Sequence, residues 1–393
     1  MIVKSHSSKL YEAGKGIMNK INFFTMLFFL YFFQTYKVNC AKENLRRRSS
    51  KAYRRKKRGD QATDVSKEEP FYTSSKEFFL AISDFLKQTP ERLPFDYVDF
   101  DYSMKAGAMI DKCDRYTRFL NRYGKKMHQL ILDLDMTNLE IRHFFRELFE
   151  KNNLSSERKK NSSSGVPKVI HQIWLGGQLP KKYKMLQETW RHNHPDWEYR
   201  LWTDKDIEDF DLYNKELFDK GINFGEKANI LRYEILYRFG GLYVDTDFEC
   251  LKPFDVLNEN YEFYCGLGPC SGALYINNAL IASVPGHPIL EYCIKNMKKN
   301  LFLWKDKLNS IPKGLRNSVR CGPSYFTKSF LKILKKHEGT AIYDNVIAFP
   351  TTYFYPISVQ HCQRGIKLEE LIKQLSDHIE SFGVHYWEGT WLR

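Results

Sequence analysis

The chain has 393 residues, of which 42% are hydrophobic and 27% are charged. This composition is typical of a globular protein, and it excludes a wholly disordered chain or one that spans a membrane many times. Most of the net charge of +14 lies at the N-terminus, because residues 1–60 hold 15 of the 61 Lys and Arg but only three of the 47 acids. The rest of the chain is nearly neutral, which argues against nucleic-acid binding along the folded surface.

An apolar run from Ile21 to Phe33 follows four lysines in the first 20 residues. A basic start before a short apolar run is typical of a secretory signal, either cleaved or kept as an anchor, although a buried helix is the alternative. We therefore expect residues 1–40 to be a signal peptide or signal-anchor that places the protein in the secretory pathway, on a membrane or outside the cell. We expect residues 41–70 to be a basic disordered segment: a spacer, a site for anionic lipids or a nuclear-type signal.

Residues 71–151 are predicted to form an N-terminal helical module. Capping boxes, in which a Ser or Thr is followed three residues later by Glu, occur at Ser74–Glu77 and Thr137–Glu140. The second box precedes an amphipathic apolar pattern that predicts a helix. Nothing in this module suggests chemistry. A polar linker over residues 152–165 separates it from the remainder of the chain.

From residue 166 to residue 393 short apolar segments alternate with helical ones, which predicts an α/β domain with its ligands at the carboxyl ends of the strands. The expected strands are Val169–Leu175, Tyr199–Trp202, Leu242–Val244, Glu262–Cys265 and Ala273–Ile276. The expected helices are Lys182–Asn193, Phe224–Phe239, Pro288–Leu303, Tyr325–Lys336 and Leu368–Glu380.

The eight cysteines are scattered, with no Cys-x-x-Cys pair and no Cys/His group at zinc spacing. A structural zinc site is therefore not expected. We interpret most of these cysteines as buried thiols, because Cys is among the residue types most often found in protein interiors.

The stretch Lys227–Cys250 is the most informative one for chemistry. Its helical part carries an apolar stripe, and Asn229 and Arg232 lie one turn apart on a neighbouring face, where they can act on a shared ligand. The pair Gly240-Gly241 ends the helix. A short apolar strand then leads directly into Asp245 and Asp247.

Two aspartates at the tip of a buried strand are suited to sharing a divalent cation, Mn²⁺ or Mg²⁺, that leaves coordination positions free for phosphate oxygens. A nucleoside diphosphate leaving group builds up negative charge as the bond to the sugar breaks. The cation neutralises that charge, and the permanently protonated Arg232 adds a second positive group.

With these residues the sequence resembles glycosyltransferase family 32, the Asp-x-Asp sugar transferases related to yeast Golgi mannosyltransferases and to the catalytic domain of the large clostridial glucosylating toxins. The resemblance covers Val166–Trp391. It rests on Pro167–Gly177, on Trp190 with His194–Tyr199, on the stretch around Asp245, and on the terminal Gly383–Trp391. It implies a GT-A type, Rossmann-like fold and transfer with retention of anomeric configuration.

The resemblance also implies roles for individual residues. Ile173 and Trp174 match residues that pack against the nucleotide base, and Tyr243 matches a donor-binding position. His385 is the first choice for a C-terminal ligand to the metal and diphosphate, Thr390 the second and Glu388 the third; Trp391 belongs to the same motif. Asn229 departs from the family, which usually has Asp there, so the identity of the donor sugar and the turnover rate are open.

We therefore expect a metal-dependent hexosyltransferase that uses a UDP- or GDP-sugar as donor. The acceptor is a hydroxyl of a glycan, a lipid or a protein, and association with a membrane would occur through the N-terminus. Asp245, Asp247 and Arg232 are the expected catalytic residues. The alternative, motivated by Asn229, is a weakly active or inactive protein that binds sugar nucleotides or glycans.

Overall fold

A computed structural model describes residues 98–110, 136–153, 165–268, 274–305, 313–357 and 368–389. The expected signal or anchor, the basic segment, the capping box at Ser74, and Thr390 and Trp391 lie outside these ranges. Within them, no helix is both long and apolar enough to cross a bilayer.

The described part centres on a six-stranded sheet with strands in the order β2-β1-β3-β6-β5-β7. Its strands are β1 (Val169–Ile173), β2 (Glu198–Trp202), β3 (Gly241–Val244), β5 (Phe263–Leu267), β6 (Ile276–Ser283) and β7 (Val346–Phe349). All pairs are parallel except those that β6 makes with β3 and β5. A separate antiparallel pair joins β4 (Phe248–Cys250) to β8 (Gly383–His385). The predicted α/β class is confirmed.

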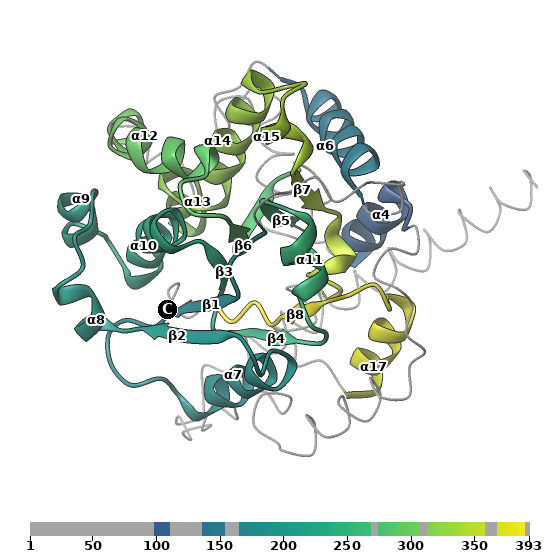
Figure 1. The fold of residues 1–393 in the computed structure, drawn as a ribbon, viewed down its shortest axis with the longest axis horizontal. Helices are drawn as coiled ribbons and strands as arrows, with labels where there is room; N and C mark the ends of the chain where they lie inside the picture. Colours follow the sequence, from purple (N-terminus) through teal and green to yellow (C-terminus); the bar gives the residue numbers. More distant parts are fainter. Residues whose placement is uncertain are drawn as a thin grey trace, which may run out of the picture. The chain divides into compact units, whose positions relative to one another are not determined.

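Helices cover the sheet on both sides. Figure 1 shows α10 (Phe224–Phe239), α12 (Pro288–Trp304), α13 (Lys313–Arg320) and α14 (Pro323–Lys336) gathered on one side, with α7 (Lys181–Asn193) on the other side, next to β4. The shorter helices are α8 (Asp204–Glu208), α9 (Lys215–Asp219), α11 (Asp255–Asn260), α15 (Ala341–Asp344) and α17 (Leu368–Asp377), with a 3-10 turn at Thr351–Tyr353.

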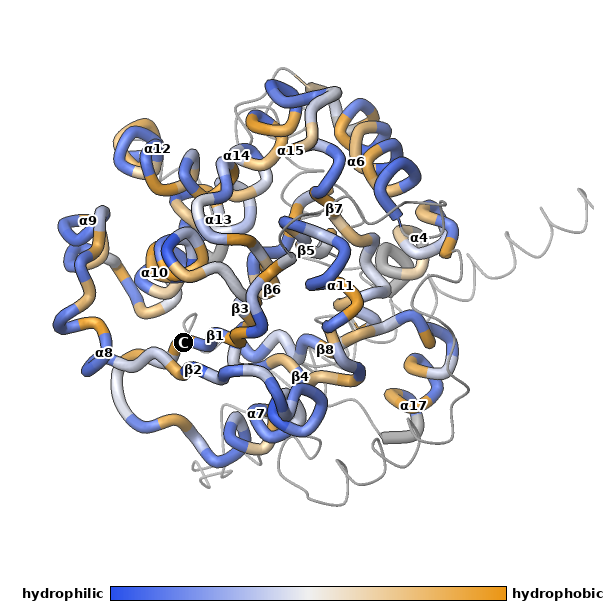
Figure 2. The backbone as a smooth tube through the Cα atoms, in the orientation of Figure 1, coloured by the Kyte–Doolittle hydropathy of each residue, from blue (hydrophilic) through white to orange (hydrophobic). Residues whose placement is uncertain are grey.

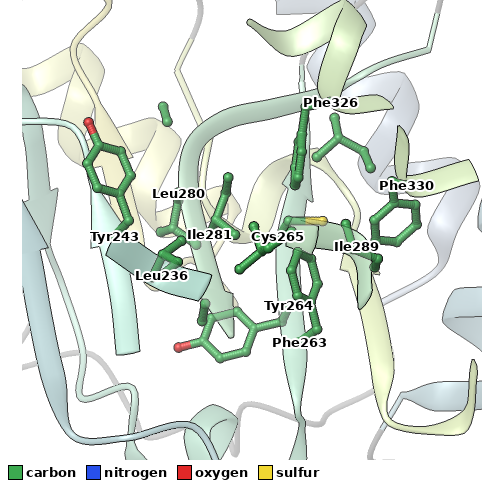
Figure 3. Close-up of a cluster of buried hydrophobic side chains, with 14 of the residues drawn as sticks. Leu236, Tyr243, Phe263, Tyr264, Cys265, Leu280, Ile281, Ile289, Phe326 and Phe330 are labelled. Atoms are coloured by element: carbon green, nitrogen blue, oxygen red, sulfur yellow. The ribbon is translucent and has the colours of Figure 1, made fainter. Parts of the chain in front are cut away.

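The core lies between the sheet and the helices α10, α12 and α14. Every residue of β3, β5 and β6 is buried, and Figure 2 shows that apolar residues are concentrated on these central strands. Figure 3 shows Leu236 of α10, Ile289 of α12 and Phe326 of α14 converging on β5 and β6. Burial of the apolar side chains between the sheet and these helices stabilises the position of the central strands.

Two helices of the predicted N-terminal module share this core. They are α4 (Phe100–Ile110) and α6 (Asn138–Asn152), and the predicted capping box at Thr137 and Glu140 is confirmed. Phe145 of α6 packs 5.9 Å from Phe330 of α14, measured between ring centroids. The side chain of Asn152 donates hydrogen bonds of 2.8 Å to the carbonyls of Tyr343 on α15 and Val346 on β7. The described part of the module therefore packs directly on the α/β core.

The prediction for the strand Ala273–Ile276 is wrong, because β6 begins where that segment was expected to end. The reason is the pair Asn277-Asn278, which interrupts the apolar pattern. Both side chains are buried, and their partners include the amide of Ala279 and the side chain of Asn229 on α10. The short strands β4, β7 and β8 were also missed. The interpretation of the cysteines as buried thiols is confirmed for the four described ones, Cys250, Cys265, Cys293 and Cys321.

His171 fixes the position of β1 against the helix end that precedes β3. Its Nε2 lies 3.0 Å from the carbonyl oxygen of Gly240, and its Nδ1 accepts a hydrogen bond of 3.2 Å from Trp202. Burial lowers the pKa of His171 from 6.5 to about 4, so the ring is neutral in the folded protein. In this pH range the unfolded chain binds a proton that the folded chain does not, and stability is lost as the pH falls from 6.5 to 4.

We predict that His171→Gln, which keeps a donor and an acceptor but does not titrate, reduces this loss. Between pH 6.5 and 4 the free energy of unfolding of the wild-type protein should fall by up to about 3 kcal/mol more than that of the variant. Urea denaturation at several pH values measures the difference. His143→Gln, at an exposed position on α6, is the control and should match the wild type. Equal losses in wild type and His171→Gln would contradict the prediction.

Candidate functional site

The two aspartates lie at the turn between β3 and β4. Asp245 follows β3 directly, and its backbone N–H donates to the carbonyl of Ala279 on β6 at 2.8 Å. The N–H of Phe248 donates back to the carbonyl of Asp245, which closes the turn. The side chains of Asp245 and Asp247 remain 28% and 13% exposed. Both carboxylates are thus partly accessible at the end of a fully buried strand.

The pairing of β4 with β8 brings His385 to Asp247. Phe248 lies opposite His385 in the register, and their rings stack with centroids 5.3 Å apart. His385 Nε2 lies 3.2 Å from Asp247 Oδ1. The ligand atoms of Asp245, Asp247 and His385 all lie within 4.8 Å of one another. The structure therefore brings together the three residues that were predicted to bind a metal.

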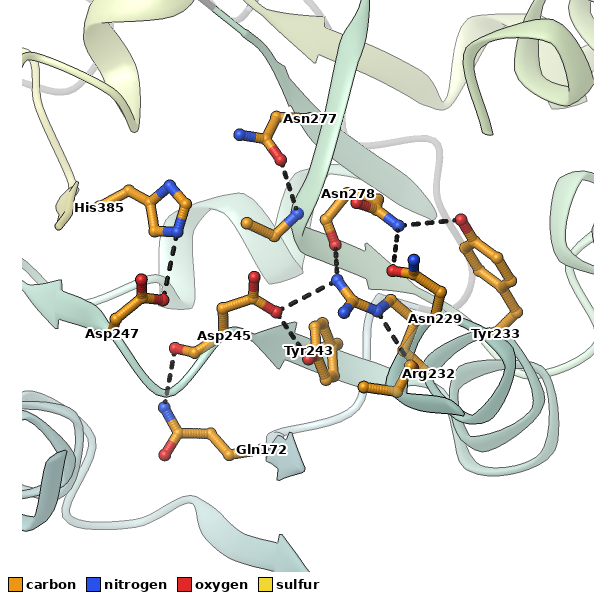
Figure 4. A network of polar contacts seen from close by, with 12 residues as sticks. Gln172, Asn229, Arg232, Tyr233, Tyr243, Asp245, Asp247, Asn277, Asn278 and His385 are labelled. Atoms are coloured by element: carbon orange, nitrogen blue, oxygen red, sulfur yellow. Dashed lines mark hydrogen bonds and ion pairs between the residues drawn. The ribbon is translucent and has the colours of Figure 1, made fainter. Parts of the chain in front are cut away.

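Arg232 lies on the other side of Asp245. Its Nη1 is 3.1 Å from Asp245 Oδ1 and also donates to the carbonyl of Asn278, and its guanidinium lies 4.4 Å from the centre of the Tyr243 ring. The Tyr243 hydroxyl donates to the same Asp245 oxygen at 2.7 Å. Figure 4 shows Arg232 of α10 and Tyr243 of β3 converging on Asp245, while the Asn278 carbonyl at the start of β6 contacts Arg232. Tyr243 and Arg232 therefore fix the orientation of this carboxylate.

The two carboxylates respond differently to this environment. Burial raises the pKa of Asp245 above its ordinary value; Arg232 opposes this rise and Asp247 adds to it. For Asp247, burial acts in the same upward direction, but His385 and the hydrogen bonds from the chain outweigh it, so its pKa is lowered. Two close carboxylates in a buried setting have unfavourable mutual repulsion that a cation relieves.

The donor set fits a divalent metal. Carboxylate oxygens and an imidazole nitrogen are ligands that Mn²⁺ accepts, and the two carboxylates also suit Mg²⁺. His385 Nδ1 is buried and finds no hydrogen-bond partner among the described residues. The ring is thus held by stacking against Phe248 and by its contact with Asp247, with Nε2 directed toward the carboxylates.

Asn229 belongs to a chain of buried amides beside Arg232. Its side-chain oxygen accepts a hydrogen bond of 2.9 Å from Asn278, and its side-chain nitrogen lies 3.3 Å from Asn317 Oδ1. Asn278 also contacts the hydroxyl of Tyr233 at 3.0 Å. Asn317, on α13, was missed by the sequence analysis, since no pattern in the chain connects it with α10.

The residues predicted to contact the nucleotide base lie at the same edge of the sheet. Because β1 and β3 run parallel, Ile173 and Trp174 emerge at the edge at which Asp245 lies. Ile173 is buried and Trp174 is half-buried, with its ring 5.1 Å from that of Tyr183.

Glu388 reaches the site through its backbone. Its N–H donates to Asp247 Oδ2 at 2.8 Å, whereas its side chain forms an ion pair of 3.0 Å with Lys182.

Comparison with known proteins supports the resemblance. Residues 180–264 match the family described as "Glycosyltransferase sugar-binding region containing DXD motif". Inositol phosphoceramide mannosyltransferase 3 of Schizosaccharomyces pombe is 34% identical over 146 residues, which are 36% of this chain and 40% of that protein. Mannosyl phosphorylinositol ceramide synthase SUR1 of Saccharomyces cerevisiae is 32% identical over 137 residues, 34% of this chain and 35% of that protein. The matches to these relatives thus cover less than half of their length.

Among solved structures, the PaToxG glycosyltransferase aligns with 51% of this chain and 80% of its own, at 16% identity and a TM-score of 0.34. The catalytic domain of the alpha-toxin from Clostridium novyi aligns with 82% of this chain and 89% of its own, at 13% identity and a TM-score of 0.29. The match of residues 180–264 to the glycosyltransferase sugar-binding region that contains the DXD motif confirms the resemblance predicted from the sequence.

Proposed function

We propose that the protein is a metal-dependent glycosyltransferase that moves a hexose from a nucleotide-diphosphate sugar to an acceptor hydroxyl. The observation that carries this proposal is the grouping of Asp245, Asp247 and His385, whose ligand atoms lie within 4.8 Å of one another, with Arg232 against Asp245. The match of residues 180–264 to sugar-binding regions supports it. Mn²⁺ or Mg²⁺ is the proposed cofactor.

In this proposal Asp245, Asp247 and His385 would hold the cation, which would supply positive charge beside the diphosphate leaving group. Arg232 contributes a second, permanent positive charge, and its burial against Tyr243 keeps it from moving as the charge develops. Ile173 and Trp174 pack against the base. The GT-A type fold and retention of anomeric configuration are part of the proposal, on the strength of the resemblance.

The relatives' names give the first substrates to test. One relative is named as a mannosyltransferase of inositol phosphoceramide, and the other as a synthase of mannosyl phosphorylinositol ceramide. We propose a UDP- or GDP-hexose as donor, with a mannosyl donor and an inositol-containing lipid as the first pair, and with glycan and protein acceptors as the alternatives. An N-terminal signal or anchor would place such an enzyme in the secretory pathway or on a membrane.

A weakly active or inactive protein that binds sugar nucleotides or glycans is the second candidate. It is favoured by the amide chain through Asn229, which places neutral groups beside Arg232 where the family usually has a carboxylate. Turnover distinguishes the two candidates, because only the first transfers the sugar efficiently.

We predict that the double variant Asp245→Asn plus Asp247→Asn loses metal-dependent hydrolysis of nucleotide sugars. Amides are weak ligands for these cations, so turnover should fall by at least roughly a hundredfold while the protein stays folded. A panel of UDP- and GDP-sugars with Mn²⁺ or Mg²⁺ measures hydrolysis, and circular dichroism checks the fold. Asp209→Asn, at an exposed acid after α8, is the control and should keep full activity. Full turnover in the double variant would end the proposal.

We predict that Tyr243→Phe weakens metal binding without unfolding the protein. The variant keeps the ring beneath Arg232 but loses the hydrogen bond to Asp245 Oδ1. Loss of a group that orients a metal ligand typically lowers metal affinity by about 10- to 100-fold. Calorimetric titration with Mn²⁺ measures this change. Tyr261→Phe, at a fully buried hydroxyl that bonds to Asn152, is the control, and its Mn²⁺ affinity should be that of the wild type.

We predict that Asn229→Asp destabilises the free protein and changes donor preference. A carboxylate cannot donate to Asn317 Oδ1, so the variant should lose about 1–3 kcal/mol of unfolding free energy. Because the new charge lies beside Arg232, the ratio of kcat/KM values across the panel of donors should shift. Asn296→Asp, at a half-buried amide on α12, controls for the change in charge. Unchanged donor ratios would show that Asn229 does not set specificity. If the wild type is inactive and Asn229→Asp has turnover, the second candidate is favoured.

A further inference from the structure

The chain after β8 turns back toward the aspartates. Trp387 is the only described non-glycine residue with a positive φ, 54°. This left-handed conformation is unfavourable for a tryptophan and persists only where its surroundings impose it. Here the ring lies 4.3 Å from that of His385, and its Nε1 donates to the carbonyl of Ile357 at 3.0 Å.

The turn at Trp387 brings two backbone groups onto Asp247. The N–H of Tyr386 donates to the carbonyl of Asp247 at 2.9 Å, and the N–H of Glu388 donates to its side-chain Oδ2 at 2.8 Å. The other carboxylate oxygen, Oδ1, faces His385. The segment Tyr386–Glu388 therefore fixes which oxygen of Asp247 is available beside His385 and Asp245.

The side chain of Glu388 anchors this segment to the first turn of α7. Its Oε2 lies 3.0 Å from Lys182 Nζ, and the two side chains are 5% and 15% exposed. Its Oε1 is buried and has no hydrogen-bond partner among the described residues. A carboxylate this deeply buried depends on its cation, and removal of that cation would leave an uncompensated charge that moves out toward water. Elsewhere in the described chain the lysine ion pairs are more exposed; Lys168 and Asp255 are 51% and 35% exposed.

The same turn of α7 also reaches the predicted base-binding side. Tyr183, adjacent to Lys182, lies 5.1 Å from Trp174 between ring centroids. Tyr183, Val384 and Tyr386 belong to one buried apolar cluster, against which Trp174 and Trp387 pack. The first turn of α7 is thus in contact with both ends of the candidate site.

We propose that Lys182 is a positioning residue for the cation site: by pairing with Glu388 it holds the segment Tyr386–Glu388 so that the Glu388 N–H orients Asp247. This inference rests on the proposed function for its consequence in catalysis, but the contact that it concerns is a property of the folded chain alone. Lys182 does not touch the reacting atoms. It acts through Glu388 and Asp247.

The test compares full-length wild type with Lys182→Met, which keeps the apolar stem and removes the charge, and with Lys182→Arg, which keeps the charge. In Lys182→Met the amide hydrogen of Glu388 should exchange at least roughly tenfold faster, and Mn²⁺ should bind about 10- to 100-fold more weakly. Lys182→Arg should stay within about threefold of wild type in both measurements, since a guanidinium also pairs with a carboxylate. Hydrogen exchange by mass spectrometry and calorimetry with Mn²⁺ alone provide the two values.

Two further variants separate positioning from general loss of stability. Lys168→Met removes a more exposed lysine ion pair just before the start of β1 and should change neither value. The exchanged pair, Lys182→Glu with Glu388→Lys, should restore much of the protection and of the Mn²⁺ affinity that Lys182→Met loses. The inference is wrong if Lys182→Met leaves hydrogen exchange at Glu388 unchanged. It is also wrong if the double variant Lys182→Glu with Glu388→Lys loses as much protection and Mn²⁺ affinity as Lys182→Met.

The failure of this inference is distinguishable from the failure of the proposed function. A wild-type protein that neither binds Mn²⁺ nor hydrolyses any nucleotide sugar would overturn the proposed function, while exchange at Glu388 would still decide whether Lys182 holds the segment. A wild-type protein that does both, with a Lys182→Met variant that matches it in Mn²⁺ affinity, would overturn the inference alone.

Discussion

The contact between Arg232 and Asp245 is the constraint on which the arrangement of the site depends. An arginine that is only 4% exposed must have its charge and its donors satisfied inside the protein. It receives Asp245 from the end of β3, the carbonyl of Asn278 from the start of β6 and the ring of Tyr243 beneath it. These partners lie on or directly after strands of the sheet, so Arg232 adds polar contacts between α10 and the sheet to the apolar contacts that hold α10 over β3 and β6.

The antiparallel direction of β6 is a consequence that supports this geometry. Since β6 runs against β3, its first residues lie at the edge where β3 ends, which places Asn277 and Asn278 beside Asp245. A parallel strand would have offered its last residues there. Asn278 bonds to Asn229 and to Tyr233, both on α10, whereas Asn277 accepts a hydrogen bond from the amide of Ala279 within β6. Buried amides are tolerated in a central strand when every group is paired in this way.

Predictability from the sequence follows the range of the interactions involved. The bounds of α10 were predicted correctly because local signals define them: the side chain of Asn223 caps its start, and Gly240, at a φ of 66°, ends it. The start of β6 was missed because the side-chain partners of Asn278 lie more than 40 residues away. His385 was identified only through a motif resemblance, because no local pattern indicates its contact with Asp247. Asn317 was not identified at all, because no local pattern indicates its contact with Asn229.

The same difference in range divides the site into two halves with different requirements for folding. Arg232 and Asp245 are close in sequence and are joined by a helix, a tight turn and one strand, whereas the contact between Asp247 and His385 closes a loop of 138 residues. Closure of a long loop costs entropy that must be recovered by the contacts that it makes. Here the recovery comes from the β4–β8 pair, from the stacking of His385 on Phe248 and from the ion pair of Lys182 with Glu388. The geometry of Asp247 therefore depends on contacts with a segment far along the chain, whereas that of Asp245 depends on Arg232 and Tyr243, which lie near it in the sequence.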